Sequence, residues 1–215
     1  MTGGNGAPFD PDCRLCPRLA SYLDEVRARH PDYHCRPVPP FGGARSRLLI
    51  VGLAPGMHGA NRTGRPFTGD HAGILLYRTL YAHGFATCAV SASADDGLRL
   101  LDCRISNAVK CLPPGNKPLP AEARRCNRYL VHELSMLPQA AVVIALGAVA
   151  HAAVLLASGL RPAARVFSHG AEHALPRERV LLDSYHCSRQ NTNTRRLTPA
   201  MFDRIFARAR HLLDA

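Results

Sequence analysis

Residues 51–70, with the sequence VGLAPGMHGANRTGRPFTGD, carry the densest set of groups that could hold a ligand. Glycines recur through the stretch and would let backbone amides approach a ligand closely. The stretch also carries hydrogen-bond donors, one flat ring and one carboxylate: Asn61, Arg62, Arg65, Phe67 and Asp70. This mixture suits an anionic polymer that has a planar ring to be gripped. A solvated glycine-rich loop is the alternative, although the stretch matches neither a phosphate P-loop nor a dinucleotide fingerprint.

Four of the eight cysteines form two pairs that could meet in space. Cys13 and Cys16 form a CxxC motif, and Cys111 and Cys126 follow much later in the chain. Four converging thiolates would fit either a zinc ion or a cubane iron–sulfur cluster, and the spacing does not choose between them. Unconnected core cysteines are the alternative.

A third polar segment, SYHCSRQNTNTRRLT at residues 184–198, contains His186 and Arg189. Taken alone, it could be a polar turn ahead of a helix. His186 and Cys187 could also form a nucleophilic pair, but residues adjacent in sequence seldom face one another productively.

Composition favours one globular domain with an anionic partner. The chain has 215 residues and 47% hydrophobic content, enough for one full core. A formal net charge of +11 favours nucleic acid as partner, with an acidic membrane surface second. The N-terminus lacks a signal-peptide pattern, and the longest apolar run, residues 140–150, is too short to span a bilayer. We therefore expect a cytoplasmic protein with no membrane partner, in which cysteines serve as thiols or metal ligands.

The elements that must position these groups alternate along the chain. Short apolar runs predict four strands, at 47–51, 102–109, 140–146 and 179–184, with residues 164–168 as a minor candidate. Amphipathic patterns and caps predict helices at 17–30, 71–84, 121–137, 148–158 and 198–213. Such alternation implies a parallel sheet covered on both faces, with ligands beyond the carboxyl ends of its strands. The polar segments lie at those ends.

Three separated motifs together resemble the uracil-DNA glycosylase superfamily, and its family five in particular: GLAPGMHGANRTGRPFTGD, SNAVKCLPPGNKP and SYHCSRQNTNTRRLT. The resemblance covers Asp12 to about Arg208, so we expect a flexible leader at 1–12 and a single domain at 13–215. It implies a three-layer α/β/α sandwich with a mostly parallel four-stranded sheet. It also implies that the two cysteine pairs hold a 4Fe-4S cluster.

The implied activity is DNA repair. Such an enzyme flips uracil out of the duplex, stabilises the departing base as an anion and leaves an abasic site. Hypoxanthine and xanthine are further implied substrates. We expect a monomer acting on damaged DNA at the nucleoid.

The family pattern assigns roles residue by residue. Phe67 would stack on the flipped ring, and the Asn107 amide would make a two-point contact with its edge. His186 matches the catalytic histidine, and Asp70 matches an acidic position near the reacting sugar. The remaining implied contacts to base, sugar or phosphates come from Gly52, Ala54, Asn61, Arg62, Arg65 and Arg189.

One departure from the wider superfamily concerns the residue before Ala54. Many relatives carry Asp, Asn or Glu there to handle the attacking water, whereas this chain has Leu53, as family five does. Leucine cannot activate water, which favours a dissociative path dominated by leaving-group stabilisation. The rival function is a non-catalytic iron–sulfur protein on the same fold that binds nucleic acid or senses redox state.

Overall fold

Four parallel strands form the centre of the molecule, and they are the four that the sequence predicts. The computed structural model describes residues 6–215. Its central strands are β2 (Leu48–Gly52), β3 (Cys103–Asn107), β4 (Val142–Leu146) and β6 (Val180–Ser184). Their carboxyl ends are level, because Gly52 lies opposite Asn107 and Leu146 lies opposite Ser184. The segments that follow these strands therefore emerge at one edge of the sheet.

The sheet has six strands in the order β1-β3-β2-β4-β6-β5, so the expected number of four is corrected. The two additional strands are short antiparallel edges, β1 (Phe41–Gly42) and β5 (Glu172–Ala174). Strands of this length carry no apolar periodicity and are defined only by pairing with a neighbour. The prediction of a minor strand at 164–168 is wrong, since a 3-10 turn at Pro162–Ala164 occupies the start of that segment.

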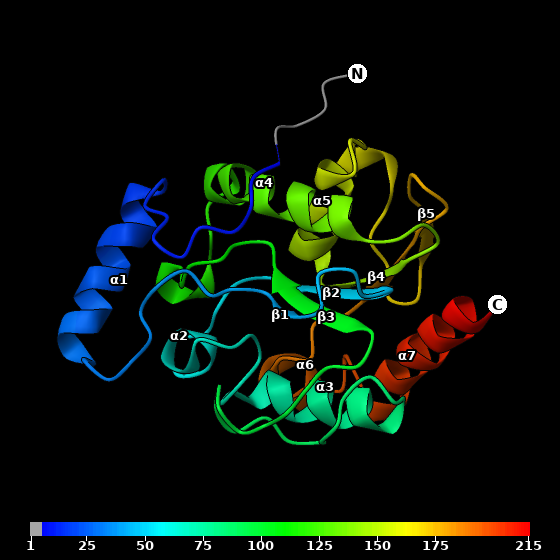
Figure 1. Ribbon diagram of the computed structural model, residues 1–215, viewed down its shortest axis with the longest axis horizontal. Helices are drawn as coiled ribbons and strands as arrows, with labels where there is room; N and C mark the ends of the chain where they lie inside the picture. The colour runs from blue at the N-terminus through cyan, green and yellow to red at the C-terminus, as the bar shows by residue number, and fades with distance from the viewer. Residues whose placement is uncertain (1–5) are drawn as a thin grey trace.

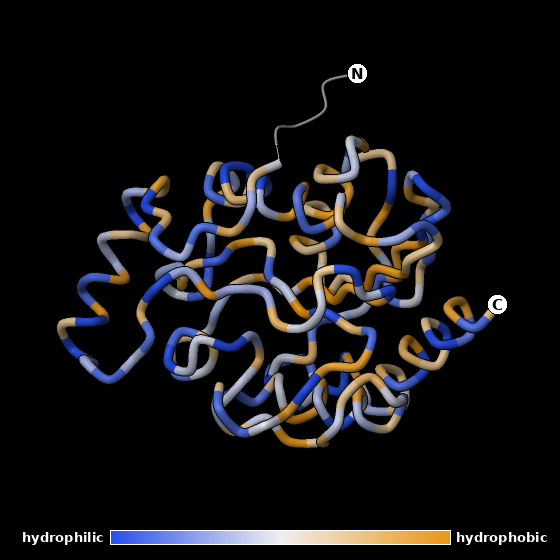
Figure 2. The backbone as a smooth tube through the Cα atoms, in the orientation of Figure 1, coloured by the Kyte–Doolittle hydropathy of each residue, from blue (hydrophilic) through white to orange (hydrophobic). Residues whose placement is uncertain are grey.

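Helices cover both faces of the sheet, which confirms the three-layer α/β/α arrangement (Figure 1). On one face lie α4 (Pro120–Met136) and α5 (Ala148–Ala157), and on the other lie α3 (His71–Ala82) and α7 (Pro199–Asp214). Alternate residues of β2 feed the two cores, with Ile50 packing in one and Val51 in the other. The central strands accordingly run as hydrophobic segments through the interior (Figure 2).

The long helices lie close to where their caps predict them. Thr198 caps α7 as expected, since its side chain accepts a hydrogen bond from Met201 N at 3.2 Å, and Pro199 occupies the first turn. Two short helices, α2 (Ala60–Thr63) and α6 (Arg189–Asn193), interrupt segments predicted as loops. Within residues 6–215 no helix combines the length and apolarity needed to cross a bilayer.

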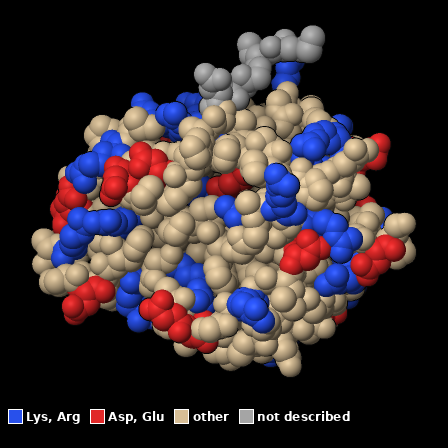
Figure 3. Space-filling view, viewed as in Figure 1, with Lys and Arg blue, Asp and Glu red and all other residues tan. Residues whose placement is uncertain are grey.

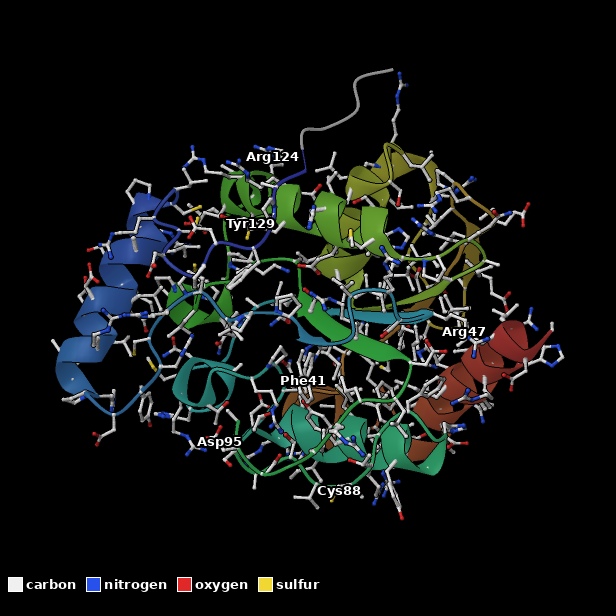
Figure 4. All side chains as sticks on the ribbon, in the orientation of Figure 1. Phe41, Arg47, Cys88, Asp95, Arg124 and Tyr129 are labelled. Atoms are coloured by element: carbon white, nitrogen blue, oxygen red, sulfur yellow. The ribbon has the colours of Figure 1, made fainter. Side chains whose placement is uncertain are left out.

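A side lobe joins α1 (Pro17–Arg29) to α4. Part of the leader predicted at 1–12 lies outside the described residues. The described part packs on the lobe, because Ala7 N donates to Arg128 O at 3.1 Å and the Phe9 ring meets Tyr129 edge to face. Figure 4 shows Tyr129 on the α4 side of this lobe.

Candidate active site

A pocket of about 580 Å³ opens at the carboxyl ends of the parallel strands. Its walls come from the segment after β2, the end of β3, the start of α5 and the segment after β6. Six residues predicted to act on a substrate line it: Ala54, Phe67, Asp70, Asn107, His186 and Arg189. Three motifs that are far apart in the chain thus meet at one cavity, because the level ends of parallel strands bring them together.

Phe67 and His186 form one wall of the pocket. Their ring centroids lie 5.8 Å apart with an interplanar angle of 27°. Phe67 has a φ of +56°, a left-handed backbone conformation that is uncommon for a bulky residue. Gly52 makes room for this ring: a Cβ there would lie 2.6 Å from Phe67 Cζ and 2.5 Å from Asn107 Oδ1. Gly52 therefore acts beneath the pocket, not as part of its lining.

The backbone of Asn107 is held at the floor of the pocket by a buried charged pair behind it. Lys110 Nζ donates to the Asn107 backbone carbonyl at 2.8 Å and to Glu133 Oε1 at 2.7 Å. The Asn107 side chain is buried, yet its Oδ1 has no partner within residues 6–215. A buried acceptor without a partner costs stability, so such an atom at a pocket indicates a ligand that satisfies it.

His186 is held in its neutral form. Burial lowers the pKa of its imidazole to about 4, because a cation cannot be solvated beside the Phe67 ring. Its Nδ1 has no partner in the described part of the chain, while its carbonyl accepts from Asn191 Nδ2 at 2.8 Å. A neutral ring with a free nitrogen can exchange hydrogen bonds with a bound base near neutral pH.

We expect the His186 ring to stay neutral down to about pH 5. Its pKa is depressed in the folded state, whereas an unfolded histidine titrates near 6.5. The unfolded chain therefore binds the extra proton first, and stability falls as pH drops from about 6.5 towards 4. NMR titration of ring-labelled protein should show this shift, and the exposed His211 provides the internal control. A His186 pKa at or above 6.5 would contradict the neutral assignment.

Asp70 both caps a helix and lines the pocket. Its side chain caps α3 by accepting from Gly73 N at 3.0 Å, and the same side chain lines the pocket. Burial raises the pKa of Asp70, and the backbone N–H groups of Ala72 and Gly73 partly oppose that effect. The Asp70 side chain packs directly on Gly59, and no larger residue fits there, since a Cβ at position 59 would lie 2.5 Å from Asp70 Oδ2.

Two predicted ligand-binding residues are instead structural. The Arg65 side chain is buried, pairs with Asp96 Oδ1 at 2.7 Å and lies over the Phe41 ring at 4.5 Å. Asn61 is also fully buried and directs its Nδ2 to Cys35 Sγ at 3.5 Å. Neither lines the pocket, so their predicted roles at sugar or phosphate are corrected. Loop composition did not reveal these partners because they come from distant segments.

Among the remaining predicted cations, Arg189 lines the pocket and Arg62 lies exposed away from it. Arg189 also borders a second hollow of about 760 Å³, the outer groove, which adjoins the pocket and is lined further along by His58, Ile74, Arg78 and Val90. On the face seen in Figure 3, basic and acidic side chains are interspersed, so the +11 charge does not form one patch there.

Sequence reasoning missed two polar residues at the junction of pocket and outer groove. Asn116 and His71 line both hollows. His71 Nε2 lies 3.1 Å from Thr192 Oγ1 and so links α3 to α6. Asn116 stands within the motif SNAVKCLPPGNKP, and that position was the available signal.

Cys187 lies in the core, not in the pocket. It is fully buried within the α3/α7 side of the molecule. Burial raises the pKa of its thiol, and the nearby Asp70 carboxylate adds to the effect. A thiol kept protonated in this way cannot serve as a nucleophile, so the alternative of a Cys187–His186 pair does not hold.

The four paired cysteines converge in the side lobe, where they line one small cavity: Cys13, Cys16, Cys111 and Cys126. A single tetrahedral zinc ion would hold its sulfurs about 3.8 Å apart, given Zn–S distances near 2.3 Å. Within residues 6–215, no three of these sulfurs lie within 4.8 Å of one another. These four thiols are the residues that would hold a zinc ion or a 4Fe-4S cluster.

Comparison with known proteins agrees with this geometry. The sequence model of the family described as "Uracil DNA glycosylase superfamily" matches residues 39–210 of this chain. The chain is 49% identical over 205 residues to a type-5 uracil-DNA glycosylase of Thermus thermophilus, covering 93% of each chain. It is 46% identical over 209 residues to one of Mycobacterium tuberculosis, covering 93% of this chain and 78% of the relative. A type-4 enzyme of Thermotoga maritima is 36% identical over 110 residues, about half of each chain.

Proposed function

The chain belongs to the uracil-DNA glycosylase superfamily, and from that premise we propose that it excises uracil from DNA. It acts as a monofunctional glycosylase, hydrolysing the N-glycosidic bond and leaving an abasic site. The observation that carries this proposal is the meeting of Phe67, Asn107 and His186 at one pocket, where buried Asn107 Oδ1 and His186 Nδ1 both lack partners among residues 6–215. The rival, a non-catalytic redox or nucleic-acid-binding protein, would not need this convergence.

Each pocket residue then has a physical task. The flipped base stacks on Phe67, and the Asn107 amide pairs with its edge. The neutral His186 imidazole stabilises the negative charge that develops on the departing base. Asp70, close to the sugar, favours the positive charge that develops there. Leu53 shapes the wall and takes no part in proton transfer.

The same pocket supports a range of deaminated bases. Leu53, Ala54 and Val149 are apolar wall residues, so no polar side chain at those positions selects against a larger ring. The volume of about 580 Å³ falls within the range of small-molecule sites, which is ample for a purine. We include hypoxanthine and xanthine among the substrates on this ground.

We assign a 4Fe-4S cluster to the cysteine cavity of the side lobe. The convergence of four cysteines at one cavity supports a four-thiolate site, and the resemblance to family five favours a cluster over zinc there. Cys13 and Cys16 would bind it at the start of α1, Cys111 from the segment after β3, and Cys126 from α4. When bound, the cluster supplies a rigid cross-link between α1, α4 and the segment after β3. That segment carries Asn116 to the pocket.

A direct assay tests the proposed activity. Purified protein is incubated with duplex DNA carrying one uracil, and alkali then cleaves the strand at abasic sites. We expect strand cleavage at the uracil position and none in matched thymine DNA. Parallel reactions on duplexes that carry one hypoxanthine or one xanthine in place of uracil measure the substrate range. Absence of cleavage in every set, by protein whose metal content is complete, would exclude the glycosylase assignment. We further propose that the protein acts as a monomer and, given a DNA substrate, in the cytoplasm at the nucleoid.

Arg189 provides a test of the DNA path. It is exposed where the pocket joins the outer groove, a suitable position for a phosphate contact. Each contact contributes about −0.9 to the slope of log affinity against log salt, so Arg189→Ala should make the slope shallower by about one unit. The slope is measured from the affinity for duplex DNA at a series of salt concentrations from low to moderate. Arg124→Ala on α4 is the control (Figure 4). An unchanged slope for Arg189→Ala would place the DNA elsewhere.

A further inference from the structure

A buried cluster of two histidines and one aspartate lies outside the pocket and has no part in the proposed reaction. Asp183 on β6 is fully buried, and His151 on α5 is 3% exposed. The His173 side chain, on the edge strand β5, is 10% exposed. One ligand atom from each of these residues lies within 4.8 Å of the other two.

The contacts of the cluster have the form of a ligand set. His151 Nδ1 lies 2.8 Å from Asp183 Oδ1, and His173 Nε2 lies 3.0 Å from Asp183 Oδ2. The other ring nitrogen of His151 lies 3.0 Å from the carbonyl of Arg165. Metal-binding histidines usually donate their second N–H to such an acceptor, which fixes the ring and raises its basicity.

The distances show how little the cluster must change to hold a cation. Both ring nitrogens of His151 lie at hydrogen-bond distance from oxygen atoms, and His173 Nε2 lies against the second oxygen of the same carboxylate. Two ligands of a tetrahedral ion, each about 2.1 Å from it, lie about 3.4 Å apart. Widening the two contacts with Asp183 by roughly half an ångström makes room for one ion, and any proton shared in those contacts is released to solvent.

We propose that His151, His173 and Asp183 form a binding site for one divalent transition-metal ion, with zinc as the best fit to two imidazoles and one carboxylate. The partial exposure of His173 leaves one side of the site open for entry and for a water as fourth ligand. The ion joins α5, β5 and β6, and so holds in place a three-residue edge strand that pairs with β6. Its role is structural.

The test uses protein with its iron and sulfide content verified, and Zn²⁺ alone as the probe. After equilibration at buffered free zinc, we expect wild-type protein to bind one equivalent of zinc with unchanged iron. His173→Gln should bind zinc at least tenfold more weakly, because a ligand is lost. His211→Gln, an exposed histidine on α7, should bind zinc as wild type does. Zinc should also raise the unfolding temperature of wild type and of His211→Gln, but not of His173→Gln.

Two outcomes overturn the proposal. One is the absence of saturable zinc binding by wild-type protein, and the other is undiminished binding by His173→Gln. Asp183→Asn serves as a second variant, and its zinc affinity is compared only if its circular dichroism is native. None of these measurements depends on glycosylase activity, so the site and the proposed function fail or stand separately.

Discussion

His186→Ala should lower the single-turnover rate of uracil release by about a hundredfold or more. Removal of one preorganised donor aimed at developing negative charge costs roughly this factor in the oxyanion holes of acyl-transfer enzymes. The neutral imidazole, whose Nδ1 has no partner in the part of the chain that the structure describes, makes His186 the strongest candidate for that donor. Asn107→Ala should have an effect of similar size, because its amide lines the pocket and is the proposed contact to the base edge.

Quench-flow measurement on uracil-containing duplex separates this effect from binding. Affinity for the abasic product should remain close to wild type in both variants, since neither side chain is needed once the base has left. Leu53→Ala is the matched control at the same pocket, and it should change the rate little because leucine only shapes the wall. Full activity of His186→Ala would contradict the role proposed for His186. The negative charge on the departing base would then be stabilised by backbone amides of the segment after β2. A Leu53→Ala variant as inactive as His186→Ala would make pocket shape the dominant factor.

Cys111→Ser should lose the inorganic cluster and the integrity of the side lobe together. Wild-type protein purified without oxygen should be brown, with iron and acid-labile sulfide near four each per chain if a 4Fe-4S cluster is bound. The variant should be colourless and should unfold at lower denaturant concentration, because a four-point cross-link between α1 and α4 is gone. Uracil excision should fall too, since the segment from Cys111 to Asn116 reaches the pocket.

Cys88→Ser is the control for this experiment. Cys88 is exposed and far from the cysteine cavity, so its loss should change neither colour nor stability (Figure 4). Stoichiometric zinc in place of iron in anaerobically purified wild-type protein would contradict the assignment. So would retention of iron and sulfide in Cys111→Ser.

Local patterns in the sequence determined the layered core and the place of its site. Each central strand is a short apolar run that must bury both faces, and each long helix carries its own periodicity and cap, as Thr198 does for α7. These signals are encoded within a few residues of where they act. The rule that ligands bind beyond the carboxyl ends of parallel strands then located the segments containing Phe67, Asn107 and His186.

The individual partners of polar side chains were decided only by the tertiary structure. Arg65 and Arg189 looked alike as loop cations, yet one is sealed against Asp96 and the other faces the pocket. The edge strand β5 and the His151–His173–Asp183 cluster likewise depend on contacts between segments that share no local pattern. A hydrogen bond or ion pair extends only a few ångströms and can join residues at any separation in the chain. Residue type alone therefore cannot tell a side chain that binds DNA from one that holds the loop in place.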